Sequence, residues 1–294
     1  MYKLSENVIQ LGNRHFNYFL VGQREAAIIE CGVTGGVLSL EKQWSEISSR
    51  PDIKFLLAMH AHFDHVCGIP KLKELFPQAK LLGSKQAQQV LNKPKIVEDF
   101  FYQDGLMSEV LFNEGILQTK PQEPPPKAII LDQIIGEGDN IVLDGNLKIK
   151  VLDAPGHSPC GLACYLPGEQ VMFLSDAAGF QISDYEIFPI FFHSYELYLE
   201  TIKKLMTFPT RILCLPHENI WINSGINDFY LRALDSAQWA FNSISRMLDD
   251  GWEEESIKQT LFRHYYQGNL KIYTTQNINI CIQLLIRRVK ECLC

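Results

Sequence analysis

The sequence predicts an α/β protein with a large apolar core. Two separate stretches have the pattern of short strands joined by turns, and strand-like and helix-like segments alternate after each of them. Apolar and aromatic residues make up 46% of the 294 residues, which suffices for a sizeable core. A chain of this length fits one large α/β domain with an appendage.

The first group of strands lies near the N-terminus. Strands are expected at residues 8–11, 17–21 and 26–29, separated by turns that contain Gly12 and Gly22, and they should form an antiparallel meander. Alternating segments follow: a helix at 38–47, a strand at 53–58, a helix at 70–76, a strand at 79–82 and a helix at 85–91.

Residues 93–127 interrupt this alternation. Residues 95–117 have a helical pattern with aromatic faces, whereas residues 118–127 hold four prolines and cannot form regular structure. We expect an inserted helical element followed by a stiff surface linker. The aromatic residues of this helix either pack in the core or contact a substrate.

The second group of strands begins after the linker. Turn sequences such as Asp144-Gly145 separate its members. Strands are expected at 129–131, 140–143, 147–152, 162–166, 171–174 and 211–215, with a helix at 199–206.

The last part of the chain reads as three helices, at 228–248, 253–265 and 274–289. We therefore expect a core domain at residues 1–225 and a helical cap at residues 226–294. Such a cap either restricts what enters the site, completes the core or forms a homodimer contact.

The composition excludes several classes of protein. A formal net charge of −7 gives no electrostatic footprint for nucleic acid. The N-terminus lacks a cationic leader, and no stretch approaches the roughly 20 apolar residues of a membrane span. We expect a soluble, cytoplasmic protein that binds neither nucleic acid nor membrane.

The eight cysteines do not form a CxxC pair, and most lie inside apolar runs. Reduced core thiols in a cytosolic protein are the favoured interpretation. Cys160 and Cys164 lie close to His157 in the sequence and are the pair to consider as metal ligands.

The densest chemical signal is a cluster of four polar residues between a strand and a helix. His60, His62, Asp64 and His65 follow the apolar strand at 53–58. Residues two apart on an extended segment point the same way, so His60 and His62 can share one cation, while the turn at Asp64 and His65 can direct the next pair toward a second. Imidazole and carboxylate suit Zn, Fe or Mn. The alternative is a histidine-rich surface loop or ordinary core histidines.

Three further ligand-type residues follow other predicted strands. His157 stands in Ala154-Pro155-Gly156-His157-Ser158, Asp176 follows the strand at 171–174, and His217 follows the strand at 211–215. Four strand ends therefore each supply a metal-type ligand.

Together these motifs resemble the ligand set of the metallo-β-lactamase fold hydrolases, in the branch that contains glyoxalase II and the quinolone signal response protein. The resemblance spans about residues 8–222 and implies a four-layer αββα sandwich with two divalent metal ions, for which zinc is expected and iron or manganese are alternatives. It implies that the first metal is held by His60, His62 and His157, the second by Asp64, His65 and His217, and that Asp176 bridges both. A bridging aspartate is not a feature of true β-lactamases, so antibiotic hydrolysis is not expected.

Two divalent cations that bridge a water lower its pKa and polarise the bond under attack. Asp64 and Asp176, besides being ligands, could pass a proton to the leaving group. The expected function is a metal-dependent hydrolase acting on a thioester or ester of a hydrophobic small molecule. The alternatives are a phosphodiesterase, a lactonase, or a regulatory binding protein that retains the metal centre.

The substrate is expected to contact an apolar segment at residues 180–198, interpreted as a loop beside the metals; core packing is the competing interpretation. The candidate substrate-binding residues are Phe63, Tyr185, Phe188, Phe191, Phe192, His193 and Tyr195.

Overall fold

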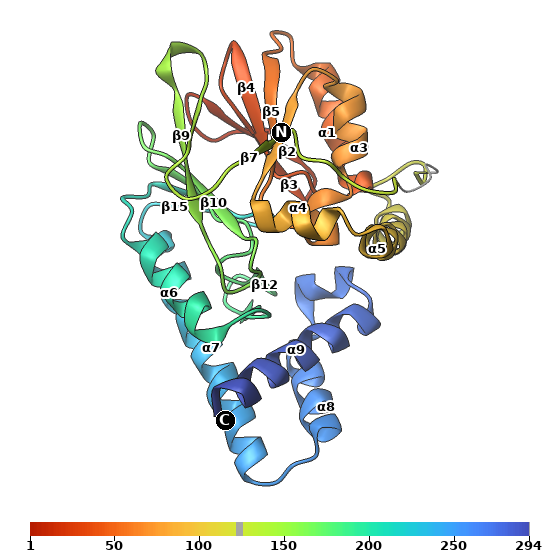
Figure 1. Ribbon diagram of the computed structural model, residues 1–294, viewed down its shortest axis with the longest axis vertical. Coiled ribbons are helices and arrows are strands. Elements are labelled where there is room, and N and C mark those ends of the chain that lie inside the picture. Colours follow the sequence, from red (N-terminus) through yellow and green to blue (C-terminus); the bar gives the residue numbers. More distant parts are fainter. Residues whose placement is uncertain (122–125, 294) are drawn as a thin grey trace.

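The computed structural model describes residues 1–121 and 126–293, and within these ranges the chain forms two facing β-sheets covered by helices. Figure 1 shows the sheets in the upper part of the molecule and the last three helices below them. The fold is an αββα sandwich with a C-terminal helical extension, as the resemblance implies. None of the helices in the described ranges combines the length and the apolar character that crossing a bilayer requires.

The first sheet contains the N-terminal meander and continues into parallel strands. Strands β1 to β4 pair antiparallel in chain order, and β4, β5, β6 and β7 pair in parallel. The strands are β1 (Tyr2–Lys3), β2 (Val8–Gly12), β3 (Asn17–Val21), β4 (Glu25–Ile29), β5 (Asp52–Ala58), β6 (Lys80–Gly83) and β7 (Gln133–Ile134).

The second sheet has the spatial order β15-β14-β11-β10-β9-β8. Within the described residues, β11 and β14 pair in parallel and the other neighbouring strands of this sheet pair antiparallel. Its strands are β8 (Asn140–Val142), β9 (Lys148–Asp153), β10 (Leu162–Leu166), β11 (Val171–Phe173), β14 (Ile212–Cys214) and β15 (Ile220–Ile222). The turn before β9 is the 3₁₀ helix η1 (Asp144–Asn146). A separate small hairpin joins β12 (Phe180–Gln181) to β13 (Ile187–Phe188).

An apolar layer joins the two sheets. Successive side chains of a strand point to opposite faces, so Phe19 and Val21 of β3 join the cluster between the sheets while Tyr18 and Leu20 face the helices. Phe19 meets Phe173 of β11 with ring centroids 5.3 Å apart. Every residue of β3 is buried, because both faces of the strand are covered.

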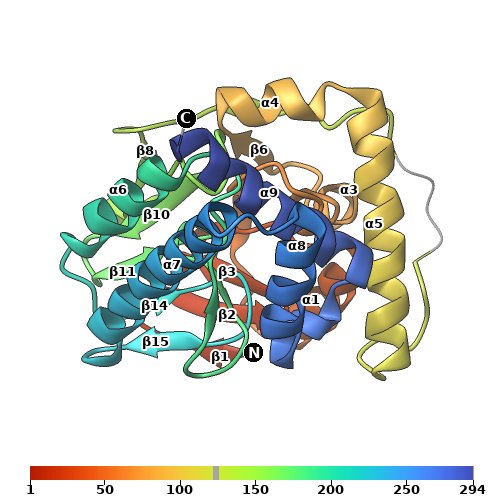
Figure 2. The same cartoon turned by 90° about the horizontal axis from the view of Figure 1, so that it is seen from below.

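The helices cover the outer faces and one end of the sandwich. Figure 2, which is seen from below, shows the last helices crossing in front of the sheets, with α5 at one side. The helices that precede the second sheet are α1 (Thr34–Glu46), α2 (Phe63–Val66), α3 (Ile69–Leu75), α4 (Lys85–Leu91) and α5 (Pro94–Asn113). Those that follow are α6 (Tyr195–Met206), α7 (Gly225–Asp249), α8 (Glu254–Tyr265), the 3₁₀ helix η2 (Gly268–Ile272) and α9 (Thr275–Leu293).

Helix α7 forms because its apolar residues recur at intervals of three and four. Phe229, Ala233, Ala237, Ala240 and Ile244 are all buried along one face. The neighbouring helix α6 begins where Ser194 caps its first turn by accepting a hydrogen bond from the backbone N–H of Leu197.

Several predicted elements differ from the structure: among them, the helix expected at 95–117 ends at Asn113 and the helix expected at 199–206 begins at Tyr195. Residues 129–131 are not a strand, because the backbone N–H groups of Ile129 and Leu131 donate to Leu91 and Gln88 of α4 rather than to a neighbouring strand. Helix α1 begins at Thr34, four residues before the predicted start at Leu38. Residues 180–198 are not one loop, since they contain the β12–β13 hairpin and the start of α6.

Part of the predicted proline linker, including Pro124 and Pro125, lies outside the described residues, as does Cys294.

Candidate metal centre

Seven side chains singled out by their sequence positions come together in two neighbouring groups. Within each group, one ligand atom from every residue lies within 4.8 Å of the others. The first group is His60, His62, His157 and Asp176, and the second is Asp64, His65 and His217.

The two sheets supply these residues from the ends of their strands. His60 and His62 follow β5 of the first sheet, and α2, which begins at Phe63, carries Asp64 and His65. The second sheet contributes His157 after β9, Asp176 after β11 and His217 after β14. The centre therefore lies where the ends of both sheets meet.

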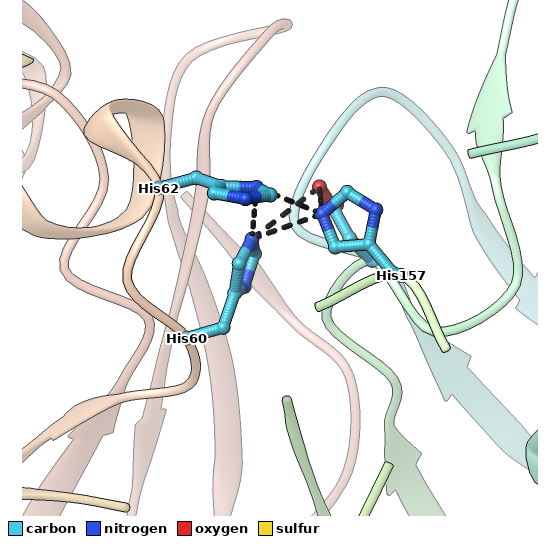
Figure 3. Close-up of side chains that lie close together, drawn as sticks. His60, His62 and His157 are labelled. Carbon is cyan, nitrogen blue, oxygen red and sulfur yellow. Dashed lines mark hydrogen bonds and ion pairs between the residues drawn. The ribbon is translucent and has the colours of Figure 1, made fainter. Parts of the chain in front are cut away.

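The first group brings three imidazole nitrogens to close quarters. Figure 3 shows the rings of His60, His62 and His157 turned toward one another. His157 Nε2 lies 2.9 Å from His62 Nδ1 and 3.2 Å from His60 Nε2, and His60 Nε2 lies 3.1 Å from His62 Nδ1. In the second group, His217 Nε2 lies 3.3 Å from His65 Nε2.

The outer nitrogens of these rings are held by the protein. His157 Nδ1 donates to the backbone oxygen of Ile190 at 2.8 Å, and His217 Nδ1 donates to that of His15 at 2.9 Å. A neutral imidazole that donates through Nδ1 carries a lone pair on Nε2, so these two inner nitrogens present lone pairs to their neighbours.

Two more rings are held in the same way. His65 Nδ1 lies 2.8 Å from Oε2 of the buried Glu30, and His60 Nδ1 lies 3.2 Å from the Ser175 hydroxyl. Partners of this kind fix the tautomer and orientation of metal-binding histidines. Converging lone pairs repel unless a cation lies between them, so the residues present fit divalent metal ions in both groups.

Asp176 connects the two groups. Its Oδ2 lies 3.4 Å from His157 Nε2 and 3.3 Å from His65 Nε2, and its Oδ1 lies 3.6 Å from His217 Nε2. If each group held an ion, Asp176 would be the carboxylate within reach of both.

The electrostatics favour ligand forms in the first group. Burial, followed by the neighbouring His157, lowers the pKa of His62 to about 3. Burial also lowers the pKa of His60 and of His157. Burial raises the pKa of Asp176, but His65, His157 and His217 outweigh it and hold that pKa well below its usual value. The three imidazoles are neutral at pH 7 and the carboxylate is ionised.

His65 behaves differently from these histidines. Burial alone would lower its pKa, but the carboxylates of Asp176, Glu30 and Asp64 outweigh burial and raise it well above the ordinary value. In the metal-free protein, the second group therefore holds a proton that a cation must displace.

A further polar group at this centre was not predicted from the sequence. The hydroxyl of Tyr273, a buried residue between η2 and α9, donates to Asp64 Oδ2 at 2.6 Å. Burial and then Asp64 raise the pKa of Tyr273, so the phenol stays protonated. No local pattern marks Tyr273, because it lies 209 residues from Asp64 in the chain.

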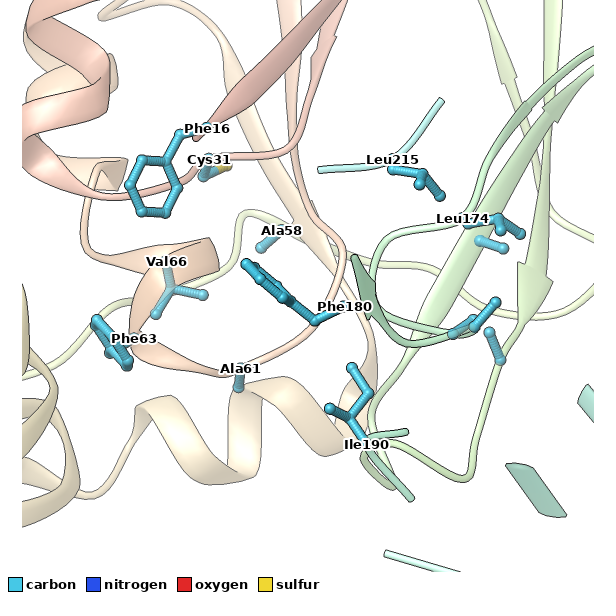
Figure 4. Packing of buried hydrophobic residues seen from close by; sticks show 14 of the residues in the cluster. Phe16, Cys31, Ala58, Ala61, Phe63, Val66, Leu174, Phe180, Ile190 and Leu215 are labelled. Carbon is cyan, nitrogen blue, oxygen red and sulfur yellow. The ribbon is translucent and has the colours of Figure 1, made fainter. Parts of the chain in front are cut away.

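Apolar side chains surround the two groups. Figure 4 shows Phe63, Phe180 and Ile190 among the packed residues of this region. Phe180 was not among the candidates, yet its ring centroid lies 5.4 Å from that of His217 and 5.5 Å from that of Tyr273.

Three predicted substrate-binding residues lie in or beside this apolar surround. Phe192 lies with its ring centroid 5.2 Å from that of His157, and Phe188 packs against Phe192 at 6.4 Å. Phe63 meets Tyr273 edge-on at 6.2 Å.

The other four candidates have different surroundings. Phe191 packs against Tyr195 and Tyr198, and Tyr195 stacks on Phe241 of α7. His193 is exposed.

Tyr185 is 85% exposed and lines an open surface cavity of about 800 Å³ beside Trp221 and Arg232, which none of the seven metal-type residues lines.

The two cysteines considered as ligands do not join either group. The Cys160 sulfur accepts a hydrogen bond from the backbone N–H of Ala61, and Cys164 contacts the Met59 sulfur inside the core. Burial raises the pKa of the Cys164 thiol, which keeps it protonated.

Comparison with known proteins agrees with this geometry. Residues 12–217 match the sequence model of the metallo-beta-lactamase superfamily. Glyoxylase B2 of Dictyostelium discoideum is 25% identical over 131 residues, which cover 42% of this chain. The putative transcription factor avaE of Aspergillus versicolor is 25% identical over 189 residues, which cover 59% of this chain. The matches cover 37% of the glyoxylase and 48% of avaE, so the chain spans less than half the length of either curated relative.

Two solved structures show a similar fold. The archaeal superfamily protein ST1585 from Sulfolobus tokodaii is 16% identical, with a TM-score of 0.56 over 98% of this chain and 99% of that one. The sec-alkylsulfatase Pisa1 from Pseudomonas sp. is 13% identical, with a TM-score of 0.66 over 98% of this chain and 49% of that one.

Proposed function

We propose that this chain, which belongs to the metallo-β-lactamase superfamily and has a candidate metal site, is a hydrolase that cleaves a thioester or carboxylic ester of a hydrophobic small molecule. The observation that carries this proposal is the apolar surround of the metal-binding groups. A hydrophobic acyl group would pack against such a surface while its carbonyl faces the metals.

The two groups of ligands divide the chemical work. When bound, two divalent cations would supply an activated water and would polarise the carbonyl under attack. His60, His62 and His157 would hold one ion, Asp64, His65 and His217 the other, and Asp176 would contact both.

Asp64 and Asp176 lie at the reacting centre and could hold the proton that the leaving group takes up. A thiol has an ordinary pKa of about 8.5, so a thiolate needs less protonation than an alkoxide when it departs. This property favours thioesters, in line with the likeness of the ligand motifs to a thioesterase-like branch.

Phosphodiesters and lactones are the alternatives at the same centre. Among the described residues, all cationic partners of Asp64 and Asp176 within 4 Å are histidines. Among these residues, neither carboxylate pairs with a lysine or arginine that could also contact a phosphate. Two divalent ions would suit a phosphodiester as well, so the preference for an ester rests on the apolar side chains around the ligands.

A substrate panel tests the proposal. The metal-loaded protein would be assayed with acyl thioesters of increasing chain length, with lactones and with bis-p-nitrophenyl phosphate. We expect kcat/KM to be largest for thioesters and to rise with acyl length, since each buried CH₂ contributes about 0.8 kcal/mol.

The His62→Ala and Asp176→Ala variants serve as controls for the metal centre, and each should lower kcat at least about 100-fold. Unchanged hydrolysis by Asp176→Ala on every substrate would exclude a mechanism that needs both ions. Turnover of the phosphodiester or lactone alone would replace the ester proposal, and no turnover of any substrate would favour a binding role.

A further inference from the structure

The C-terminal extension contributes a polar group to the metal centre. Tyr273 lies beyond the segment that matches the superfamily, which ends at residue 217. Its hydroxyl donates to Asp64 Oδ2 at 2.6 Å, and both residues are buried. This hydrogen bond joins the extension to the core domain and not one helix of the extension to another.

The oxygen that Tyr273 contacts is the one that faces the second metal group. Asp64 Oδ2 lies 3.7 Å from His217 Nε2 and 3.9 Å from His65 Nε2. A carboxylate oxygen has two lone pairs, so Oδ2 can accept from the phenol and still offer a lone pair to a cation. The hydrogen bond therefore sets the direction in which Asp64 presents that lone pair.

The phenol ring is held in place by aromatic neighbours. Its centroid lies 5.5 Å from that of Phe180 at an interplanar angle of 77°, and 6.2 Å from that of Phe63 at 89°. The edge-on arrangement with His217, at 6.4 Å and 80°, continues the same packing. A ring restrained on three sides keeps its hydroxyl aimed at one atom.

The backbone that carries Tyr273 is fixed to the β12–β13 hairpin. Asn269 donates from its backbone N–H to the Ile182 oxygen at 2.9 Å and from its side chain to the Gln181 oxygen at 3.2 Å. Gly268 allows this approach, because a Cβ at that position would lie 2.3 Å from the Ile182 oxygen. Tyr266 adds a hydrogen bond from its hydroxyl to the Tyr273 backbone oxygen at 3.0 Å.

We propose that Tyr273 is a positioning residue for the second metal group, through which the C-terminal extension orients Asp64 as a ligand. The inference rests on the metal-dependent part of the proposed function and is independent of which ester, lactone or phosphodiester is cleaved. It assigns the extension a part in metal binding that the superfamily match does not include.

The test measures metal binding by the full-length Tyr273→Phe variant, which keeps the ring and removes the hydroxyl. Zn²⁺ would be titrated at pH 7 in competition with a chromogenic chelator. We expect one equivalent to bind as in the wild type and the other to bind about 10–100-fold more weakly, which is the usual effect of removing a group that orients a ligand. The absorption spectrum of the Co²⁺-loaded protein should change at the second equivalent only.

Tyr265→Phe is the matched control. Tyr265 is also buried in the extension, and its hydroxyl has no hydrogen-bond partner among the described residues. It should bind both equivalents as the wild type does. Wild-type affinity of Tyr273→Phe for both equivalents would overturn the proposal. Equal weakening of both, together with a lower unfolding temperature of the metal-free variant, would overturn it in favour of a purely structural role.

The two proposals can fail separately. A selective loss of the second zinc equivalent without turnover of any ester would support the role of Tyr273 and reject the proposed substrate class. Ester hydrolysis by the wild type, together with unchanged zinc affinity in Tyr273→Phe, would support the proposed substrate class and reject the role of Tyr273.

Discussion

His62 differs from the other metal-facing histidines in that the residue as a whole is partly exposed, although its imidazole lies against those of His60 and His157. It also has a pKa of about 3, lowered first by burial and then by His157. In the unfolded chain its pKa returns to about 6.5. At a pH between these two pKa values, His62 therefore carries a proton in the unfolded state but not in the folded state.

This difference predicts a pH dependence of stability for the metal-free protein. Because the unfolded state gains the proton, the contribution of His62 is complete above about pH 6.5 and is lost as the pH falls toward 3. In His62→Gln, the unfolding free energy should fall less steeply with decreasing pH, by up to about 1 kcal/mol per pH unit. Urea unfolding in EDTA from pH 6.5 to 4.5 measures this, and parallel curves for wild type and variant would contradict it.

The residues of the two candidate metal groups could be found from the sequence, but the residues that orient their side chains could not. His60, His62, Asp64 and His65 stand in one local motif. Their supports come from far away: Glu30 lies 35 residues from His65, and the His15 oxygen lies 202 residues from His217. No local pattern marks a residue whose role depends on such a distant partner.

At the scale of elements, glycines in two helices have opposite surroundings. Gly36 lies in α1, where a Cβ would be 2.4 Å from the Tyr18 hydroxyl oxygen. Gly105 lies in α5, where a Cβ would have no atom within 4 Å. Gly36 therefore lets α1 pack on β3, while Gly105 has no such steric requirement.

These glycines give a prediction with an internal control. Gly105→Ala should raise the unfolding free energy by up to about 1 kcal/mol, the usual gain of alanine over glycine inside a helix. Gly36→Ala should lower it by about 1–3 kcal/mol, because Tyr18 must move. Chemical denaturation of both variants measures the two changes. A higher unfolding free energy for Gly36→Ala would contradict the prediction, because it would mean that the Tyr18 side chain moves aside without cost.

Elements were predictable from the sequence where their local preference and their surroundings agree. Strands β3 and β10 and helix α4 follow from period and turn residues, because their local preference agrees with their environment. The start of α1 was missed because Gly35 and Gly36 are typical of a loop, and only contacts with Leu117 and Tyr18 require them there. Residues 129–131 have strand composition, but α4 takes their hydrogen bonds.

At the scale of the whole molecule, the metal centre joins the two sheets. His60 and His62 come from the first sheet, whereas His157 and Asp176 come from the second. A cation that binds all four would hold the sheets together in the folded state and would have no preformed site in the unfolded chain.

Removing the metals should therefore lower the stability of the entire sandwich. At a free metal concentration 1,000 times the dissociation constant, the stabilisation is about 4 kcal/mol per site. We expect a clear drop in unfolding temperature after dialysis against EDTA and its recovery on adding Zn²⁺, measured by calorimetry. His62→Ala should show a smaller difference between the two conditions, and an unfolding temperature insensitive to EDTA would argue against metal binding at these residues.

The order of the residues along the chain also bears on how the protein is made. Synthesis proceeds from the N-terminus, so the growing chain contains the whole first metal group once Asp176 has been added. The second group must wait for His217, and Asp64 obtains its tyrosine partner only when Tyr273 has been made. Because neither group is preformed in an unfolded chain, the second group would be complete only after the C-terminal helices have folded onto the sandwich.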